Sequence, residues 1–139
     1  MKTTIIGIVP RHSKNNIYSH YRLPPVGIVS VFSQIKDNLD LEVYLIDENN
    51  YAGPRDHNGD PDHTFLQKLR PANVTMFYGG MTNSIPRMLS LAQQYKRFGA
   101  ITVAGGSHVD ALPDEALKSG VDIVVHGEGE QTVKELLPF

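Results

Sequence analysis

The sequence predicts an α/β protein built on a doubly wound, five-stranded parallel sheet. Apolar runs of strand length alternate with segments whose apolar residues recur at helical spacing. This alternation is typical of consecutive βαβ units. Two of the runs, residues 101–104 and 121–125, lead into glycine-bearing turns. Because ligands of open parallel sheets bind where the strands end, we expect these turns to line a binding site.

The first half of the chain contains two predicted strands. An apolar run predicts the first at about residues 3–9, and the polar stretch 10–23 predicts a loop. Pro25 suits the first position of a helix, which we expect to end near residue 38. A second strand is predicted at about residues 42–47.

The second half opens with a polar segment, residues 48–63, whose Asn, Asp, Gly and Pro content predicts a second long loop. Thr82 or Ser84 can cap the longest helix that follows, and Gly99 can end it. The remaining strands are expected at about residues 73–78, 100–104 and 121–125, and the remaining helices at about 64–69, from the cap to 98, 114–119 and from about 130.

Five strands and five helices joined by right-handed crossovers describe a flavodoxin-like (Rossmann-like) three-layer sandwich. A length of 139 residues fits one such domain with a sizeable core. We therefore expect residues 1–139 to form a single α/β domain.

Composition and charge exclude several classes of partner. The net charge is −2, with acidic and basic residues interspersed, which favours neither nucleic acid nor an anionic membrane. No apolar run approaches the length of a membrane span, and the N-terminal apolar stretch indicates a buried strand, not a signal peptide. The chain contains no Cys, which is compatible with the reducing cytoplasm where we expect the protein.

Several motifs occur together in an order and spacing that are typical of one family. Their residues are Gly105, Gly106, Ser107 and His108, then 112–117, 121–122 and 126–132 in the second half, and 23–28 and 43–47 in the first. On these motifs the chain resembles the cobalamin-binding domain found at the N-terminus of many radical S-adenosylmethionine proteins. The resemblance covers nearly the whole chain.

The resemblance implies that the loops after strands one, three, four and five hold the lower face of the corrin ring and its nucleotide tail. Hydroxyl groups suit the tail, because a buried base or phosphate without polar partners costs a few kcal/mol. Glycines let the tail pass close to the backbone. The implied cofactor-binding residues are Pro10, His12, Gly79, Gly80, Met81, Thr82, Ser84, Gly105, Gly106, Ser107, His108, Gly127, Glu128 and Gly129.

His12 is the candidate cobalt ligand. Methionine-synthase-like cobalamin domains carry Asp-x-His-x-x-Gly after the first strand, and His12 is in register with that histidine. The Asp and the Gly are absent here, and a metal-bound imidazole nearly always has a second partner that orients it. The sequence therefore favours a solvated loop histidine and a cobalamin with no protein ligand below the cobalt. Relatives also often carry Ser where Gly79 stands.

Two other polar groups have simpler interpretations than chemistry. His57 and His63 lie among acidic residues of the second loop without the regular spacing of zinc or calcium ligands, which predicts a solvated acidic loop. Glu128 and Glu130 diverge around Gly129, so we expect them to shape a turn and favour a helix N-terminus.

Other functions of doubly wound sheets find little support. A response regulator needs an Asp at the end of the third strand, where Tyr78 stands. A flavodoxin needs a hydroxyl-rich phosphate loop after the first strand, and a dinucleotide-binding fold needs Gly-x-Gly-x-x-Gly there. Residues 10–15 provide neither.

The resemblance implies a parent enzyme, such as a methyltransferase or a cyclase, that uses cobalamin, S-adenosylmethionine and a 4Fe–4S cluster. The cluster needs closely spaced cysteines, and this chain has none. We therefore expect an excised N-terminal domain that binds cobalamin next to a C-terminal catalytic barrel and catalyses nothing alone. The alternative is a degenerate domain that serves as a docking module without cofactor. A rim filled by Tyr78, Met81 or the loop 51–60 would favour that alternative.

Overall fold

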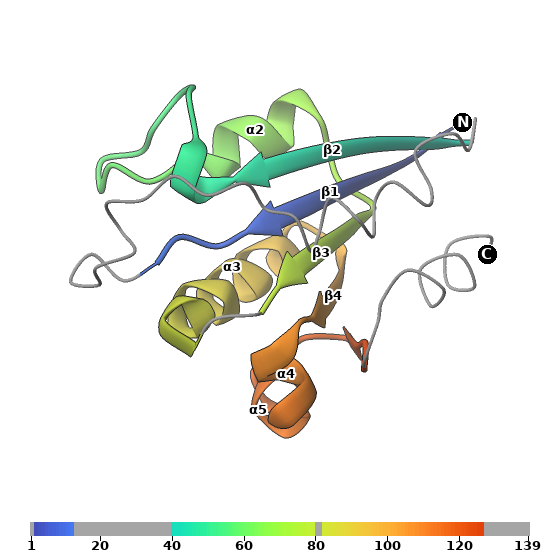
Figure 1. The fold of residues 1–139 in the computed structure, drawn as a ribbon. Helices are drawn as coiled ribbons and strands as arrows, with labels where there is room; N and C mark the ends of the chain where they lie inside the picture. The colour runs from blue at the N-terminus through green and yellow to red at the C-terminus, as the bar shows by residue number, and fades with distance from the viewer. Residues whose placement is uncertain (1, 13–39, 80–81, 127–139) are drawn as a thin grey trace.

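A single parallel sheet organises the part of the chain that the computed structural model describes, namely residues 2–12, 40–79 and 82–126 (Figure 1). Its five strands lie in the order β2-β1-β3-β4-β5, and every pair is parallel. The strands are β1 (Thr3–Val9), β2 (Leu41–Asp47), β3 (Val74–Tyr78), β4 (Ile101–Gly105) and β5 (Ile123–Val124). The predicted flavodoxin-like sheet is thereby confirmed.

The helices agree with the prediction except at one place. Those described are α2 (His63–Leu69), α3 (Ile85–Arg97), α4 (Ser107–Ala111) and α5 (Pro113–Lys118), with 3-10 turns at Glu48–Asn50 and Thr82–Ser84. Helix α4 was not predicted. Ser84 is the N-cap residue of α3, although its side chain makes no capping hydrogen bond. The helices expected at 25–38 and from residue 130 lie outside the described residues.

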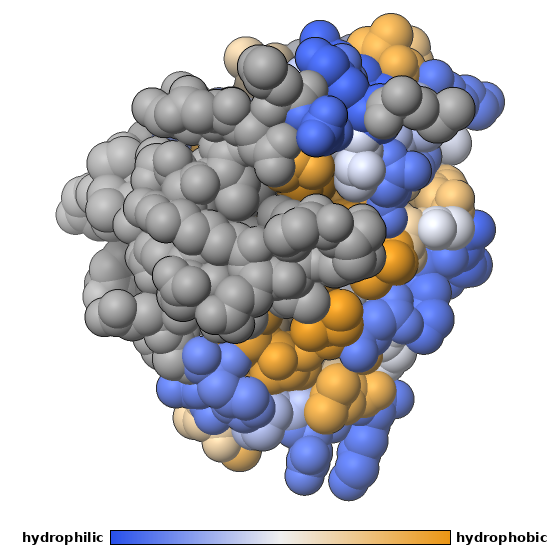
Figure 2. Space-filling view, turned by 90° about the vertical axis from the view of Figure 1, so that its right-hand side faces the viewer, coloured by the Kyte–Doolittle hydropathy of each residue, from blue (hydrophilic) through white to orange (hydrophobic). Residues whose placement is uncertain are grey.

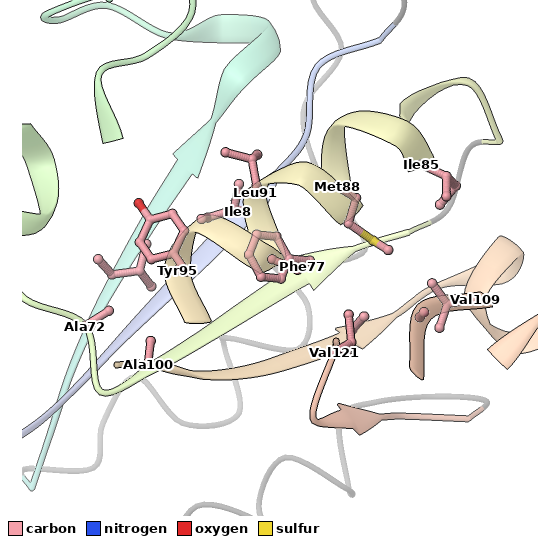
Figure 3. Close-up of a cluster of buried hydrophobic side chains, with 14 residues drawn as sticks. Ile8, Ala72, Phe77, Ile85, Met88, Leu91, Tyr95, Ala100, Val109 and Val121 are labelled. Atoms are coloured by element: carbon pink, nitrogen blue, oxygen red, sulfur yellow. The ribbon is translucent and has the colours of Figure 1, made fainter. Parts of the chain in front are cut away.

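Helix α3 supplies most of the core on one face of the sheet. Its apolar residues recur at helical spacing, so Met88, Leu91 and Tyr95 all point toward the strands and are fully buried (Figure 3). They pack with Ile8 of β1 and Phe77 of β3. Burying each such side chain stabilises the fold by about 2 kcal/mol.

The strands are apolar on both faces. In β1, Ile6 and Ile8 belong to the cluster under α3, whereas Ile5 and Val9 belong to a second cluster on the opposite face. Nearly continuous apolar runs of this kind are expected of a parallel sheet that is covered on both sides. In Figure 2, hydrophobic residues form a band beside a region of hydrophilic ones. No helix within the described ranges is long and apolar enough to cross a membrane.

The topology creates one distinctive position. Strand β1 lies between β2 and β3, so the chain leaves β1 toward one side of the sheet and later returns to its other side. The loops after β1 and β3 therefore diverge, and ligands of this fold class bind in the crevice between such loops at the carboxyl ends of the strands. The carboxyl edge is the place to look for a site.

Candidate functional site

The loop after β1 is held against the turn after β2 by side chains of that turn. The Arg11 N–H donates to Glu48 Oε1 at 3.1 Å, and the His12 N–H donates to Asn49 Oδ1 at 3.1 Å. Asn49 Nδ2 in turn donates to the Pro10 carbonyl at 3.3 Å. Pro10 is fully buried, while Arg11 and His12 are half-buried. Residues 10–12 are therefore fixed through their backbone.

Glu48 is the centre of a buried polar cluster below this loop. Arg87 donates to both carboxylate oxygens, from Nε at 2.9 Å and Nη2 at 2.8 Å. His63 Nε2 lies 2.8 Å from Glu48 Oε2, and His63 Nδ1 lies 2.7 Å from the Tyr95 hydroxyl. We refer to these groups, together with the Arg11 and Asp60 side chains that pair beside them, as the Glu48 network: Arg11, Glu48, Asp60, His63, Arg87 and Tyr95.

The charges of the Glu48 network stabilise one another. Burial alone would raise the pKa of Glu48, but hydrogen bonds from His63 and Arg87, and the Arg87 charge, lower the pKa to about 2. Burial would lower the pKa of Arg87, yet its bonds to Glu48 raise it. Burial also raises the pKa of Tyr95, which keeps its hydroxyl neutral. An ionised Glu48 only accepts, so His63 Nε2 donates, and Nδ1 of a neutral ring then accepts from Tyr95.

The prediction of a solvated acidic loop at 48–63 is therefore wrong for part of that loop. Asp60 and His63 are buried at 6% and 3% relative exposure because they pair with Arg11, in the loop after β1, and Tyr95, on α3, both far away in sequence. His57 is exposed, as expected. Within the described ranges, no group of three or more His, Cys, Asp or Glu residues could hold a metal ion.

The ends of β3 and β4 are joined by backbone groups. The Gly79 N–H donates to the Gly105 carbonyl at 2.6 Å, and the Gly79 carbonyl accepts from the N–H groups of His108 and Val109 at 2.9 and 3.3 Å. These bonds attach α4 to the end of β3. The amide of Gly79 serves this junction, so its role in the site is to allow close packing.

Gly79 is required by its neighbours. A Cβ at this position would overlap Cγ2 of Val109 and would lie 3.1 Å from Sδ of Met88. Both neighbours are buried in the core under α3. A serine would not fit here unless Val109 moved. The hydroxyl that the sequence lacks is thus replaced by an apolar contact.

Gly105 and Gly106 have different reasons to be glycine. Among the described residues, a Cβ on Gly105 would meet only Val125, at an ordinary distance of 3.6 Å. Packing among the described residues therefore does not require a glycine there, because a Cβ would only make an ordinary van der Waals contact with Val125. Gly106 has φ of +113°, a conformation that favours glycine, and it leads directly into α4.

Two histidines flank this glycine pair. His108, on α4, is half-buried, and its Nε2 lies 3.4 Å from Oε1 of Glu115. His126 follows β5 and is exposed, with Nδ1 3.2 Å from Oδ1 of Asp110. Contact through the His108 backbone was expected, and its N–H is in fact bound to Gly79. Both imidazoles lie beside carboxylates that α4 and α5 supply.

The structure brings together the described residues of the predicted site at the carboxyl edge, with one correction. His12 was expected in solvent but is half-buried, and its Nδ1 atom is buried, because the turn after β2 holds the loop. Ser84 is buried at the start of α3. At this edge are Pro10, His12, Gly79, Thr82, Gly105, Gly106, Ser107 and His108, whereas Gly80, Met81, Gly127, Glu128 and Gly129 lie outside the described residues.

Sequence reasoning missed the residues that support this edge. Glu48, Asn49 and Arg87 carry no motif, and each acts on a partner distant in the chain. The one available signal was the charged Glu48 directly after the apolar run of β2, where the carboxyl edge begins.

Comparison with known proteins identifies the family. The N-terminal domain of the hypothetical protein TM0182 from Thermotoga maritima is similar in structure, with 22% sequence identity, 88% of this chain and 94% of that chain covered, and a TM-score of 0.45. No curated protein is significantly similar to the chain. The model of the B12 binding domain family matches residues 14–137. Since this match spans most of the chain, the protein belongs to the B12 binding domain family.

Proposed function

We propose that this domain binds a cobalamin along the carboxyl edge of its sheet and holds the lower face of the corrin ring and the nucleotide tail. Membership of the B12 binding domain family supports the class of ligand. The observation that carries the proposal is Gly105, a glycine at the end of β4 that no packing contact within the described part of the chain requires.

The described residues fit such a ligand. Gly105 and Gly106 carry no Cβ, so the backbone at the end of β4 would let a flat ring or its tail come close. The flanking loops offer uncharged glycine backbone and neutral polar groups, and the charged groups of the Glu48 network neutralise one another. A large, mostly uncharged cofactor with amide substituents suits a surface of this composition.

Each part of the edge has a distinct role in the proposal. The loop after β1 supports the ring, and Gly105 and Gly106 allow close approach of the tail. When bound, cobalamin would supply a cobalt centre that carries a methyl group or assists radical chemistry. We propose that the cobalamin binds without a protein ligand below the cobalt. If a side chain did bind the cobalt, His12 would be the candidate.

The parent enzyme in this proposal is a radical S-adenosylmethionine protein, such as a methyltransferase or cyclase. The motif order at residues 105–108 and 126–132 supports it. Such an enzyme needs S-adenosylmethionine and a 4Fe–4S cluster, and this chain lacks the cysteines that would bind the cluster. A C-terminal barrel, working in the reducing cytoplasm, would then be the partner that supplies catalysis.

A titration with hydroxocobalamin, followed by desalting, tests the binding. We expect the domain to retain the corrin with a visible spectrum unlike that of the free cofactor. In Gly105→Ala, the added methyl would stand in the path of the ligand, so the affinity should fall about tenfold or more while the urea midpoint stays unchanged. Ser90→Ala, on the exposed side of α3, is the matched control and should bind as wild type does.

Three results would decide the details. A spectrum that changes in His12→Ala would assign that imidazole to cobalt, and an unchanged one would support binding without a protein ligand. Gly105→Ala with wild-type affinity would contradict the proposed path of the ligand. Corrin that washes through the wild-type domain would overturn cobalamin binding by this domain and favour a docking module.

A further inference from the structure

The side chain of Asn49 completes the sheet at the point where β1 can no longer pair through its backbone. The parallel register of β1 and β2 ends with Val9 opposite Asp47. The first residue after β1 is Pro10, which has no N–H to donate to the ladder. Beyond it, the primary amide of Asn49 donates to the Pro10 carbonyl and accepts from the His12 N–H. One side chain therefore replaces one missing peptide group.

Asn49 is itself held in place before it can hold the loop. It lies in the 3-10 turn Glu48–Asn50, whose N-cap is Asp47. Asp47 Oδ1 accepts from the Asn49 N–H at 3.0 Å, and Asp47 Oδ2 accepts from Asn50 Nδ2 at 2.6 Å. The preceding residue, Glu48, is fixed by Arg87. These bonds hold the turn in one conformation and thereby fix the position of Asn49.

We infer that Asn49 is a positioning residue for the cobalamin site, which orders residues 10–12 before the cofactor arrives; this inference rests on the proposed function. A loop that is already ordered does not lose its conformational freedom on binding, so affinity increases without any contact between Asn49 and the ligand. The role requires a donor and an acceptor on one planar group. Neither a carboxylate nor an apolar side chain provides both.

Two variants separate the two halves of the amide. Asn49→Ala removes both hydrogen bonds, whereas Asn49→Asp keeps an acceptor for the His12 N–H and turns an oxygen toward the Pro10 carbonyl. Asn58→Ala is the control, because Asn58 is an exposed asparagine of the same polar segment. The native turn of Asn49 is anchored through its backbone, so we expect both variants to fold with a urea midpoint close to that of wild type.

The experiment measures the ordering of the loop and the affinity for the cofactor separately. Amide hydrogen exchange of His12 in the cofactor-free domain should become about tenfold faster in Asn49→Ala and change less in Asn49→Asp. The Kd for hydroxocobalamin should rise about five- to tenfold in Asn49→Ala, which corresponds to one or two lost hydrogen bonds. Asn58→Ala should match wild type in both measurements.

The outcomes distinguish this inference from the function on which it rests. Unchanged His12 exchange in Asn49→Ala would overturn the positioning role, whether or not the domain binds cobalamin. Faster exchange with an unchanged Kd would show that the ordered loop does not serve the cofactor, and would also overturn it. If the wild-type domain binds no cobalamin, the proposed function fails by its own test, and the inference fails with it.

Discussion

The two halves of the carboxyl edge are held together by different kinds of interaction. Next to β1 and β2, the loops are held by polar and charged side chains around Glu48, with partly buried Arg87 and buried His63 as its partners. Next to β3 and β4, the loops are held by backbone hydrogen bonds of Gly79 and by apolar contact with Val109. Both halves belong to the same sheet and open at the same edge.

This difference means that the two halves respond to different changes. A half that depends on charge is sensitive to pH and tolerates little loss of charge, because an unpaired buried ion is costly. A half that depends on close packing is insensitive to pH but responds to a single added carbon atom. The variants below test this division, beginning with the largest expected effect.

Glu48→Gln should destabilise the domain most, by about 3 kcal/mol at pH 7, because the partly buried Arg87 loses its buried, charged partner. The folded pKa of Glu48 is about 2, below its usual 4.5, so ionised Glu48 stabilises the fold fully above pH 4.5. That stabilisation is lost as the pH falls from 4.5 to about 2. Urea unfolding at pH 7, 4 and 3 measures both effects.

The control for this prediction is Glu42→Gln, an exposed glutamate on β2. It should lower the free energy of unfolding by less than about 0.5 kcal/mol and keep the pH dependence of wild type. The difference in free energy of unfolding between wild type and Glu48→Gln should become smaller at low pH. A difference that stays constant from pH 7 to pH 3 would show that Glu48 does not stabilise this half through its charge.

Gly79→Ala should destabilise the domain by about 2 kcal/mol, because its Cβ would overlap Val109. The effect should be the same at pH 7 and pH 4, since no titratable group lies at the clash. Gly105→Ala, at the residue that pairs with Tyr78 in the sheet register, adds only an ordinary contact and should change stability by about 0.5 kcal/mol or less.

A double variant sharpens this prediction. Val109→Ala removes the methyl groups that obstruct residue 79, so Gly79→Ala should cost less in that background than in wild type. Equal costs in the two backgrounds would mean that the clash is relieved elsewhere. The β3–β4 half would then be less tightly packed than its geometry indicates.

Tyr95→Phe should destabilise the domain by about 1 kcal/mol, less than Glu48→Gln or Gly79→Ala, and it probes the residue that joins His63 to the core under α3. The ring lies in the core under α3, in edge contact with Phe77 and Phe98, and Phe preserves those contacts. The hydroxyl bonds to buried His63, which would lose a partner. Thermal unfolding against Tyr44→Phe as control measures this loss. Equal stability of the two variants would exclude a stabilising role for the hydroxyl.

The fold could be predicted from the sequence because each of its main elements has a local residue pattern. Each strand is an apolar run and α3 carries its apolar stripe in periodic order, so the five strands and their parallel order follow from pattern alone. Helix α4 was missed because it has only five residues and depends on Gly79, whose carbonyl accepts two of its N–H groups. A short helix that depends on a hydrogen-bond acceptor distant in the sequence has no local residue pattern that would predict it.

The site could be predicted only in part, for the same reason. The glycines at 105 and 106 were visible because turns need them in any context. Asp60 and His63 were assigned to solvent because acidic and Asn-rich segments usually lie there, but partners distant in the sequence, such as Arg11 and Tyr95, make their burial favourable. The clash that requires glycine at position 79 depends on Val109, which no motif connects to it.

The bonds of Glu48 also have a consequence for the order of folding. Glu48 joins Arg11, 37 residues before it, to Arg87, 39 residues after it, so its bonds require β1, β2 and α3 to be assembled. Contacts of such long separation close large loops and are expected to form after the rate-limiting step. In stopped-flow experiments, Glu48→Gln should therefore unfold faster while its refolding rate changes little. The Glu48 network would then slow the unfolding of the sheet edge once the fold is complete.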